Sequence, residues 1–117
     1  MKFLSMVKSA EHQGPPPMVL MEAVGGLVEE ATKAGIVINV GGLMPSQMGA
    51  RVRLSNGKLS VTDGPFAEAR EVIGGYAMFE LKSKEEAIDW AKRLLALHLE
   101  HWPEREGECE IRQIASE

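Results

Sequence analysis

The residues whose types are best suited to chemistry surround the short segment Asp63-Gly64-Pro65-Phe66. A carboxylate at the end of a strand, held by a Gly-Pro turn, can act as a general base or orient a ligand when burial raises its pKa. An Asp before Gly-Pro also commonly accepts hydrogen bonds from the backbone N–H groups of its own turn, which is a structural role. Asp63 is therefore a candidate catalytic residue, with turn capping as the alternative.

Four further polar side chains are candidates for ligand binding: Arg51, Arg53, Glu68 and Tyr76. Two guanidinium groups can hold a carboxylate or a phosphate through paired hydrogen bonds, and a phenol can donate a hydrogen bond in a cleft. The alternative for the two arginines is a pair of solvated edge-strand charges or partners of nearby carboxylates. A solvated face is the alternative for Glu68, and a strand position at the water boundary is the alternative for Tyr76.

Two histidines near a helix end, His98 and His101, have a spacing that can ligate a metal, with Glu108 or Glu110 as a third ligand. An imidazolium near a helix C-terminus is also favoured by the helix dipole. We therefore predict no metal site and no cofactor. Cys109 has no neighbouring motif of a nucleophilic cysteine, and we expect a small residue buried in a strand.

The clearest local signal is Asn56-Gly57, the preferred pair for a two-residue hairpin turn. Pairing Ser55 with Lys58 makes one face of the hairpin apolar and places Arg51 and Arg53 on the polar face. The polar face leads directly into Asp63, so we expect the carboxylate and the two guanidinium groups to converge.

The remaining elements follow from periodicity and from helix end signals. The apolar spacing after Pro17 predicts a helix that ends at Gly35, and Ser83 with Glu86 forms a capping box that opens a second helix, with Asp89 and Arg93 as an i, i+4 pair on its flank. Short apolar runs predict strands over residues 2–8, 36–40, 76–81 and 109–115. The order predicts an α+β, ferredoxin-like βαββαβ fold with an inserted β-hairpin, in which two helices cover one face of an antiparallel sheet.

The other face of such a sheet needs a cover, and a second copy of the chain would supply it, so we expect a homodimer. The chain of 117 residues is the size of one domain, and we treat residues 1–117 as such. A net charge of −4 disfavours nucleic acid as a partner. The sequence shows no signal peptide or membrane-spanning run, and its single cysteine suits a reducing compartment, so we expect a cytoplasmic protein away from membranes.

The segment from Asp63 to Tyr76 closely resembles the DGPF-domain branch of the YCII-related family. The resemblance extends over nearly the whole chain, through the opening strand, Lys33-Ala34-Gly35, Gly42-Leu43 with Pro45-Ser46, the start of the second helix and Glu108 to Arg112. It implies a dimeric ferredoxin-like α+β barrel, a family mostly of unknown function, and frequent association of DGPF members with extracytoplasmic-function sigma factors.

An enzymatic role in this family is suspected from a histidine and an aspartate, and Asp63 stands at the position of that aspartate. The sequence has no histidine between Gln13 and Leu97, so the first helix does not supply an imidazole partner. We therefore expect a homodimer with a cleft near Asp63 for a small polar or acidic molecule, and whether that molecule is turned over stays open. The alternatives are a regulatory module acting with a sigma factor and a structural dimer without a ligand.

Overall fold

The computed structural model describes residues 1–66 and 71–115. In chain order its elements are β1 (Lys2–Ser9), η1 (Glu11–Gln13), α1 (Met18–Lys33), β2 (Val37–Gly42), η2 (Ser46–Met48), β3 (Ala50–Ser55), β4 (Lys58–Asp63), β5 (Val72–Glu80), α2 (Lys84–His101) and β6 (Gly107–Gln113). Among these residues, no helix is long and apolar enough to cross a membrane.

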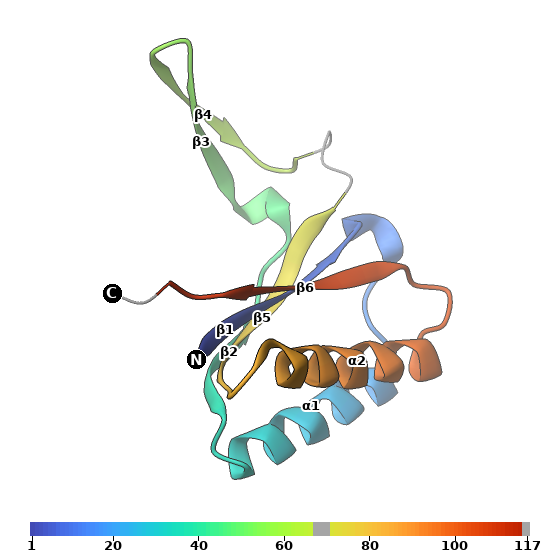
Figure 1. Ribbon diagram of the computed structural model, residues 1–117. Helices are drawn as coiled ribbons and strands as arrows, with labels where there is room; N and C mark the ends of the chain where they lie inside the picture. The colour runs from blue at the N-terminus through green and yellow to red at the C-terminus, as the bar shows by residue number, and fades with distance from the viewer. Residues whose placement is uncertain (67–70, 116–117) are drawn as a thin grey trace.

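The main sheet of the described residues has the strand order β2-β5-β1-β6, with antiparallel pairing throughout. Both α-helices lie on one side of this sheet (Figure 1). Without the β3–β4 hairpin, the element order is βαββαβ, which confirms the expected α+β, ferredoxin-like arrangement. The hairpin is a separate two-stranded sheet that projects from the body of the molecule (Figure 1).

Helix ends follow the signals in the sequence. Gly35 adopts a φ of 76°, the left-handed conformation that ends α1. At the start of α2, the Ser83 hydroxyl accepts a hydrogen bond from the Glu86 N–H at 3.3 Å.

The expected Asp89–Arg93 pair was wrong. The Arg93 guanidinium instead binds the carboxylate of Glu30 on α1, with nitrogen-to-oxygen distances of 2.5 and 2.7 Å. Arg93 therefore links the two helices rather than supporting its own, because the two-pronged guanidinium matches a carboxylate on the facing helix.

All four strands of the main sheet differ from their predicted bounds, β5 and β6 the most. β5 begins at Val72, before the expected start at Tyr76, because Gly75 continues the ladder as the partner of Val7 and Gly42. β6 spans Gly107–Gln113, two residues earlier than expected at each end, because Gly107 already pairs with Ser9.

The side chains on the helix-facing side of β1 and β5 are large at one end of the sheet and smaller beyond it. At one end, Phe3 and Phe79 are paired neighbours and pack with Leu81, Ala87 and Trp90 into the core. The next row along β1 and β5 pairs Ser5 with Ala77, and the row after that pairs Val7 with Gly75. The sheet is therefore densely covered at the Phe3 end and carries little side-chain volume at the Gly75 end.

The projecting hairpin, β3 with β4, is named the arm below. Its register confirms the predicted one in full, with Ser55 opposite Lys58 and a turn in which Asn56 and Gly57 have φ values of 51° and 74°. The apolar face consists of Val52, Leu54, Leu59 and Val61, and each of these side chains is 69–74% exposed. The arm thus presents an apolar surface that its own chain does not cover.

Candidate functional site

The segment after β4 locks the base of the arm to the body. The Gly64 N–H donates to the Gly49 carbonyl at 2.9 Å, and the peptide bond between Gly64 and Pro65 is cis. A Cβ atom on Gly64 would lie 1.6 Å from the Ser46 carbonyl oxygen. Only glycine fits here, because the two backbones approach too closely for any side chain.

A polar network on the other side of Ser46 holds the same base. The Ser46 side chain is buried, and its hydroxyl and backbone N–H both donate to the carboxylate of Glu11. The Ser46 hydroxyl also accepts from the Phe66 N–H at 3.2 Å. These two bonds from Ser46, first the hydroxyl and then the N–H, lower the pKa of the Glu11 carboxyl.

The arm does not bring the predicted carboxylate and guanidinium groups onto one face. Asp63 is exposed and pairs with Ala50, so strand alternation puts it on the apolar face with Val61. Arg51 and Arg53 pair with Thr62 and Ser60, on the opposite face. The expected convergence left strand alternation out of account. Asp63 lies one residue from Thr62 and three from Ser60 along β4, so its side chain points to the opposite face from theirs.

The surroundings of the other predicted ligand-binding residues differ. The Arg51 guanidinium carbon sits 3.9 Å from the centroid of the Phe66 ring, and Glu68 lies outside the described residues. The Tyr76 ring covers Gly41 of β2, where an added Cβ would meet the ring at 3.0 Å. Of the four described candidates, Asp63, Arg51 and Arg53 belong to the arm and Tyr76 belongs to the main sheet.

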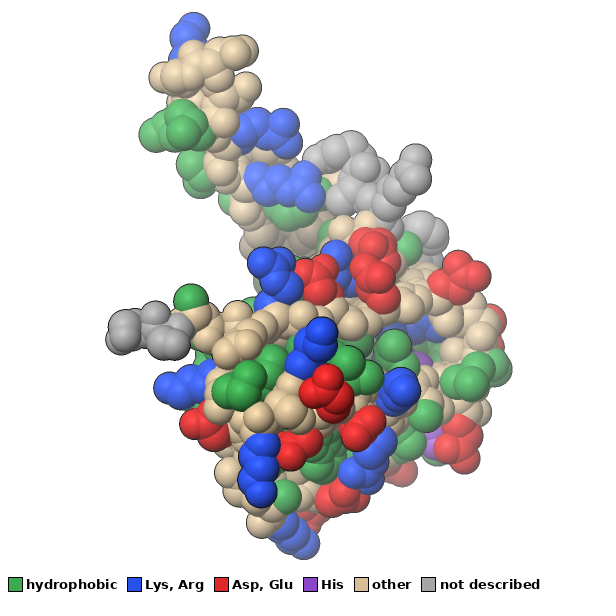
Figure 2. All heavy atoms as spheres, in the orientation of Figure 1, with side chains coloured by type: hydrophobic (Ala, Val, Ile, Leu, Met, Phe, Trp, Pro, Cys, Tyr) green, Lys and Arg blue, Asp and Glu red, His purple; other side chains and the backbone are tan. Residues whose placement is uncertain are grey.

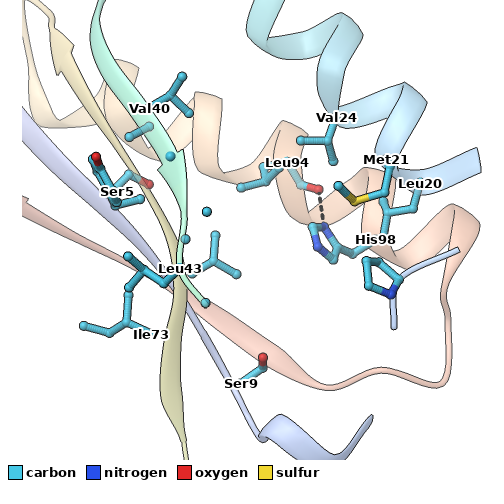
Figure 3. Close-up of a pocket in the computed structure, with 18 of the residues that line it drawn as sticks. Ser5, Ser9, Leu20, Met21, Val24, Val40, Leu43, Ile73, Leu94 and His98 are labelled. Carbon is cyan, nitrogen blue, oxygen red and sulfur yellow. Dashed lines mark hydrogen bonds between the residues drawn. The ribbon is translucent and has the colours of Figure 1, made fainter. Parts of the chain in front are cut away.

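A cavity of about 670 Å³ lies between the helices and the sheet. Its walls come from α1, α2, β1, β2 and β5, and they are mainly apolar (Figure 3). Val24 and Met21 face it from α1, and Leu94 faces it from α2 (Figure 3). Tyr76 is among the lining residues, whereas Asp63, Arg51 and Arg53 are not among those described as lining it.

The cavity follows from the size gradient of the sheet. Its floor includes Ser5, Ala77 and Gly75, which leave the inner faces of the helices without large partners. α2 packs on β1 and β6, whereas α1 packs on α2 and reaches the sheet at β2. The space under α1 therefore stays open.

Polar groups meet the cavity where β1 and α2 both end. The imidazole Nδ1 of His98 lies 2.9 Å from the Leu94 carbonyl oxygen (Figure 3). A carbonyl can only accept, so Nδ1 carries the hydrogen and Nε2 is left for another partner. Ser9 and Arg105 also line this end, and the Arg105 guanidinium donates to the Ser9 hydroxyl.

Sequence reasoning considered His98 as a metal ligand or as a cation favoured by the helix dipole, and it did not single out Ser9 or Arg105. The sequence positions of His98 and Arg105 do not indicate a shared site, because Ser9 joins them only once β1 has folded beside α2. Across the described residues, no three histidine, cysteine or acidic side chains group into a metal site. Burial raises the pKa of the Cys109 thiol, which disfavours the nucleophilic thiolate.

Comparison with known families accounts for most of this architecture. A family model for the YCII-related domain matches residues 1–106. The chain belongs to the YCII-related family. The matched range of this YCII-related protein contains the arm, both helices and the residues that line the cavity.

One relative of this YCII-related protein is an uncharacterised protein of Rhizobium meliloti (strain 1021), 33% identical over 75 residues. The aligned stretch covers 64% of this chain and 60% of that relative. The chain thus spans about 60% of the length of the curated relative it matches.

The close backbone contact at Gly64 predicts that adding a single methyl group there lowers the free energy of unfolding strongly. Gly64→Ala should destabilise the protein by about 3 kcal/mol or more, the upper range for overpacking, because the Ser46 backbone must move. Gly26→Ala is the matched control: a Cβ there meets nothing within 4 Å, and Ala in a helix should stabilise by roughly 0.5–1 kcal/mol. Urea unfolding of both variants measures the difference, and equal stabilities would contradict the lock.

The Glu11–Ser46 contact predicts a pH effect on stability. Because the folded-state pKa of Glu11 is depressed, its contribution is present above the unfolded pKa of about 4.3 and is lost as the pH falls. Glu11→Gln should therefore flatten the loss of unfolding free energy between about pH 5 and pH 3. Glu22→Gln, at an exposed position of α1, should leave the wild-type slope. A parallel slope in both variants would contradict the role of Glu11.

Proposed function

We propose that this YCII-related protein, a member of the DGPF branch, is a cytoplasmic homodimer that binds a small molecule in the cavity between its helices and its sheet. The observation that carries the proposal is the cavity. Its volume of about 670 Å³ falls within the range of roughly 300–1,000 Å³ typical of ligand pockets. A mainly apolar wall with a few polar groups at one end is also typical of such pockets.

The cavity is much larger than the voids that imperfect packing leaves in a protein interior. Protein interiors are packed about as densely as organic crystals and contain few voids larger than a water molecule. Val24 and Leu94 are only half-buried because they face this space. A ligand with an apolar body would bury these side chains and stabilise the fold.

This site differs in place from the cleft expected near Asp63. Tyr76 borders the cavity, but strand alternation puts its ring on the open face of the sheet beside Met6, and Asp63, Arg51 and Arg53 belong to the arm. A catalytic role for Asp63 and ligand roles for Arg51, Arg53 and Glu68 stay proposals from the sequence, and binding in the cavity does not depend on them.

The cavity can be probed with 1-octanol, an uncharged apolar molecule. Both tryptophans of the chain, Trp90 and Trp102, line the cavity, so their fluorescence should change saturably on titration. Ala77→Leu places a larger side chain on the cavity floor and should weaken octanol binding about tenfold or more. The same variant should raise the unfolding free energy without ligand by about 0.5–2 kcal/mol, as cavity filling commonly does.

Ala34→Leu is the matched control, because it makes the same substitution at an exposed position outside the described lining. It should bind octanol as the wild type does. Failure of the wild type to bind octanol would contradict the proposal. So would an Ala77→Leu protein that is less stable and binds octanol unchanged.

The homodimer part of the proposal is supported by the sheet face that the helices leave open. Strand alternation places Leu4 and Met6 of β1 on this face, with their β5 partners Met78 and Tyr76. The rim is charged: Lys8 forms an ion pair with Glu110 at 3.1 Å. An apolar centre with a polar rim is the usual layout of a protein interface.

The arm supplies a second apolar surface. Figure 2 shows it standing clear of the body, with hydrophobic and basic side chains on it. Contiguous exposed apolar surface of this kind is typical of contact sites. In the proposed dimer the arm lies against the partner copy, and Asp63, on the arm's apolar face, comes with it into the interface.

Substitutions on the two faces of one strand test the arm. Val61→Asp puts a charge on the apolar face and should convert the dimer to monomer, because burying an unpaired carboxylate is costly. Thr62→Asp, one residue on and on the opposite face, should leave the dimer intact. Light scattering after size exclusion gives the mass.

A dimeric Val61→Asp protein would contradict the role of the arm. A monomeric wild type would contradict the homodimer altogether. That second result would favour the alternative in which the arm engages a different protein, such as a sigma factor.

A further inference from the structure

The polar lining of the cavity gathers in one corner, where β1, η1 and the end of α2 meet. Ser9, Glu11, Gln13, His98 and Arg105 all lie there. Two of these groups are already occupied. The carboxylate of Glu11 is held by Ser46, and the amide of Gln13 is bonded to the backbone of Ala10 and Glu106.

Arg105 is the cation of this corner, and it lacks a counter-ion among the described residues. Its side chain is half-buried, and no described carboxylate lies within 4 Å of it. Burial lowers the pKa of the guanidinium, because a partly buried cation is less well solvated than an exposed one. A half-buried cation without a counter-ion is an unfavourable arrangement that an anionic ligand would relieve.

The position of Arg105 is fixed before any ligand arrives. Its guanidinium carbon lies 5.2 Å from the centroid of the Trp102 ring, and it donates one hydrogen bond to the Ser9 hydroxyl. Its backbone N–H donates to the Trp102 carbonyl at 3.1 Å. A guanidinium has five N–H donors, so donors beyond the one given to Ser9 are available. A preorganised cation of this kind binds a carboxylate at little entropic cost.

The corner and the apolar walls together define the class of ligand. We propose that the cavity binds amphipathic carboxylic acids, with the carboxylate paired to Arg105 and the hydrocarbon or aromatic body between α1 and the sheet. This inference rests on the proposed function, because it requires the cavity to be a ligand site. It adds the charge of the ligand and the residue that recognises it.

Octanoate and 1-octanol form a matched pair of probes, since they share chain length and differ in the charged head. Tryptophan fluorescence and titration calorimetry should show that the wild type binds octanoate about tenfold or more tightly than octanol, as expected for charge-assisted hydrogen bonds. Arg105→Gln should abolish this preference by weakening octanoate binding far more than octanol binding. Arg105→Lys, which keeps the charge, should retain part of the preference.

Lys84→Gln controls for net charge, because it removes one positive charge at an exposed position outside the described lining. It should keep the wild-type preference. Thermal unfolding without ligand establishes that each variant is folded.

The outcomes separate this inference from the proposed function. If the wild type binds both probes equally, or if Arg105→Gln keeps the preference for octanoate, the recognition of carboxylate is wrong while the cavity stays a ligand site. If the wild type binds neither probe, the proposed function itself is wrong. The wild-type ratio alone decides the inference should the Arg105 variants fail to fold.

Discussion

The organisation of this protein depends on how two helices cover a sheet whose side chains become smaller along its strands. Phe3 and Phe79 fill the space between the helices and the sheet at one end, and Ser5, Ala77 and Gly75 leave it open farther along, under α1. The paired Glu30 and Arg93 tie α1 to α2. α1 is therefore held at its neighbouring helix and at β2, and the apolar inner face of that helix borders a cavity.

The Asp63-Gly64-Pro65-Phe66 segment has a clear mechanical role in this arrangement. Gly64 packs directly on the Ser46 backbone, and Ser46 is in turn bonded to Glu11 and Phe66. The arm therefore leaves the body from a fixed base. A rigid base and an exposed apolar face together suit an element that reaches a partner copy.

The sequence predicted local structure and topology well, because these depend on signals within a few residues. Asn56-Gly57 gave the turn and register of the arm, and Gly35 and Ser83 gave the helix ends. The family followed from the segment between Asp63 and Tyr76, and the match over residues 1–106 confirms it. Predictions were wrong where the contact joins two elements that are distant in sequence. Arg93 is an example, because its partner on α1 is 63 residues away.

The cavity is the feature that could least be predicted from the sequence. It requires knowing that Ser5, Ala77 and Gly75 share a face and that α1 lies over them, which only the register of β1 with β5 shows. Arg105 could not be recognised as a candidate binding residue from the sequence, because its position is set by contacts with Ser9 and Trp102 that only the fold creates. The expected site near Asp63 relied on proximity along the chain, whereas the cavity is built from proximity in space.

The most direct measurement is a methionine-methyl NMR spectrum of the ¹³C-labelled protein during titration with octanoate, since methionines lie both inside and outside the cavity. Met21 and Met44 line it, whereas Met6 and Met78 lie on the open face of the sheet. The account predicts saturable shifts of the Met21 and Met44 methyl signals, with those of Met6 and Met78 unchanged. Shifts confined to Met6 and Met78, or no shift at all, would contradict it.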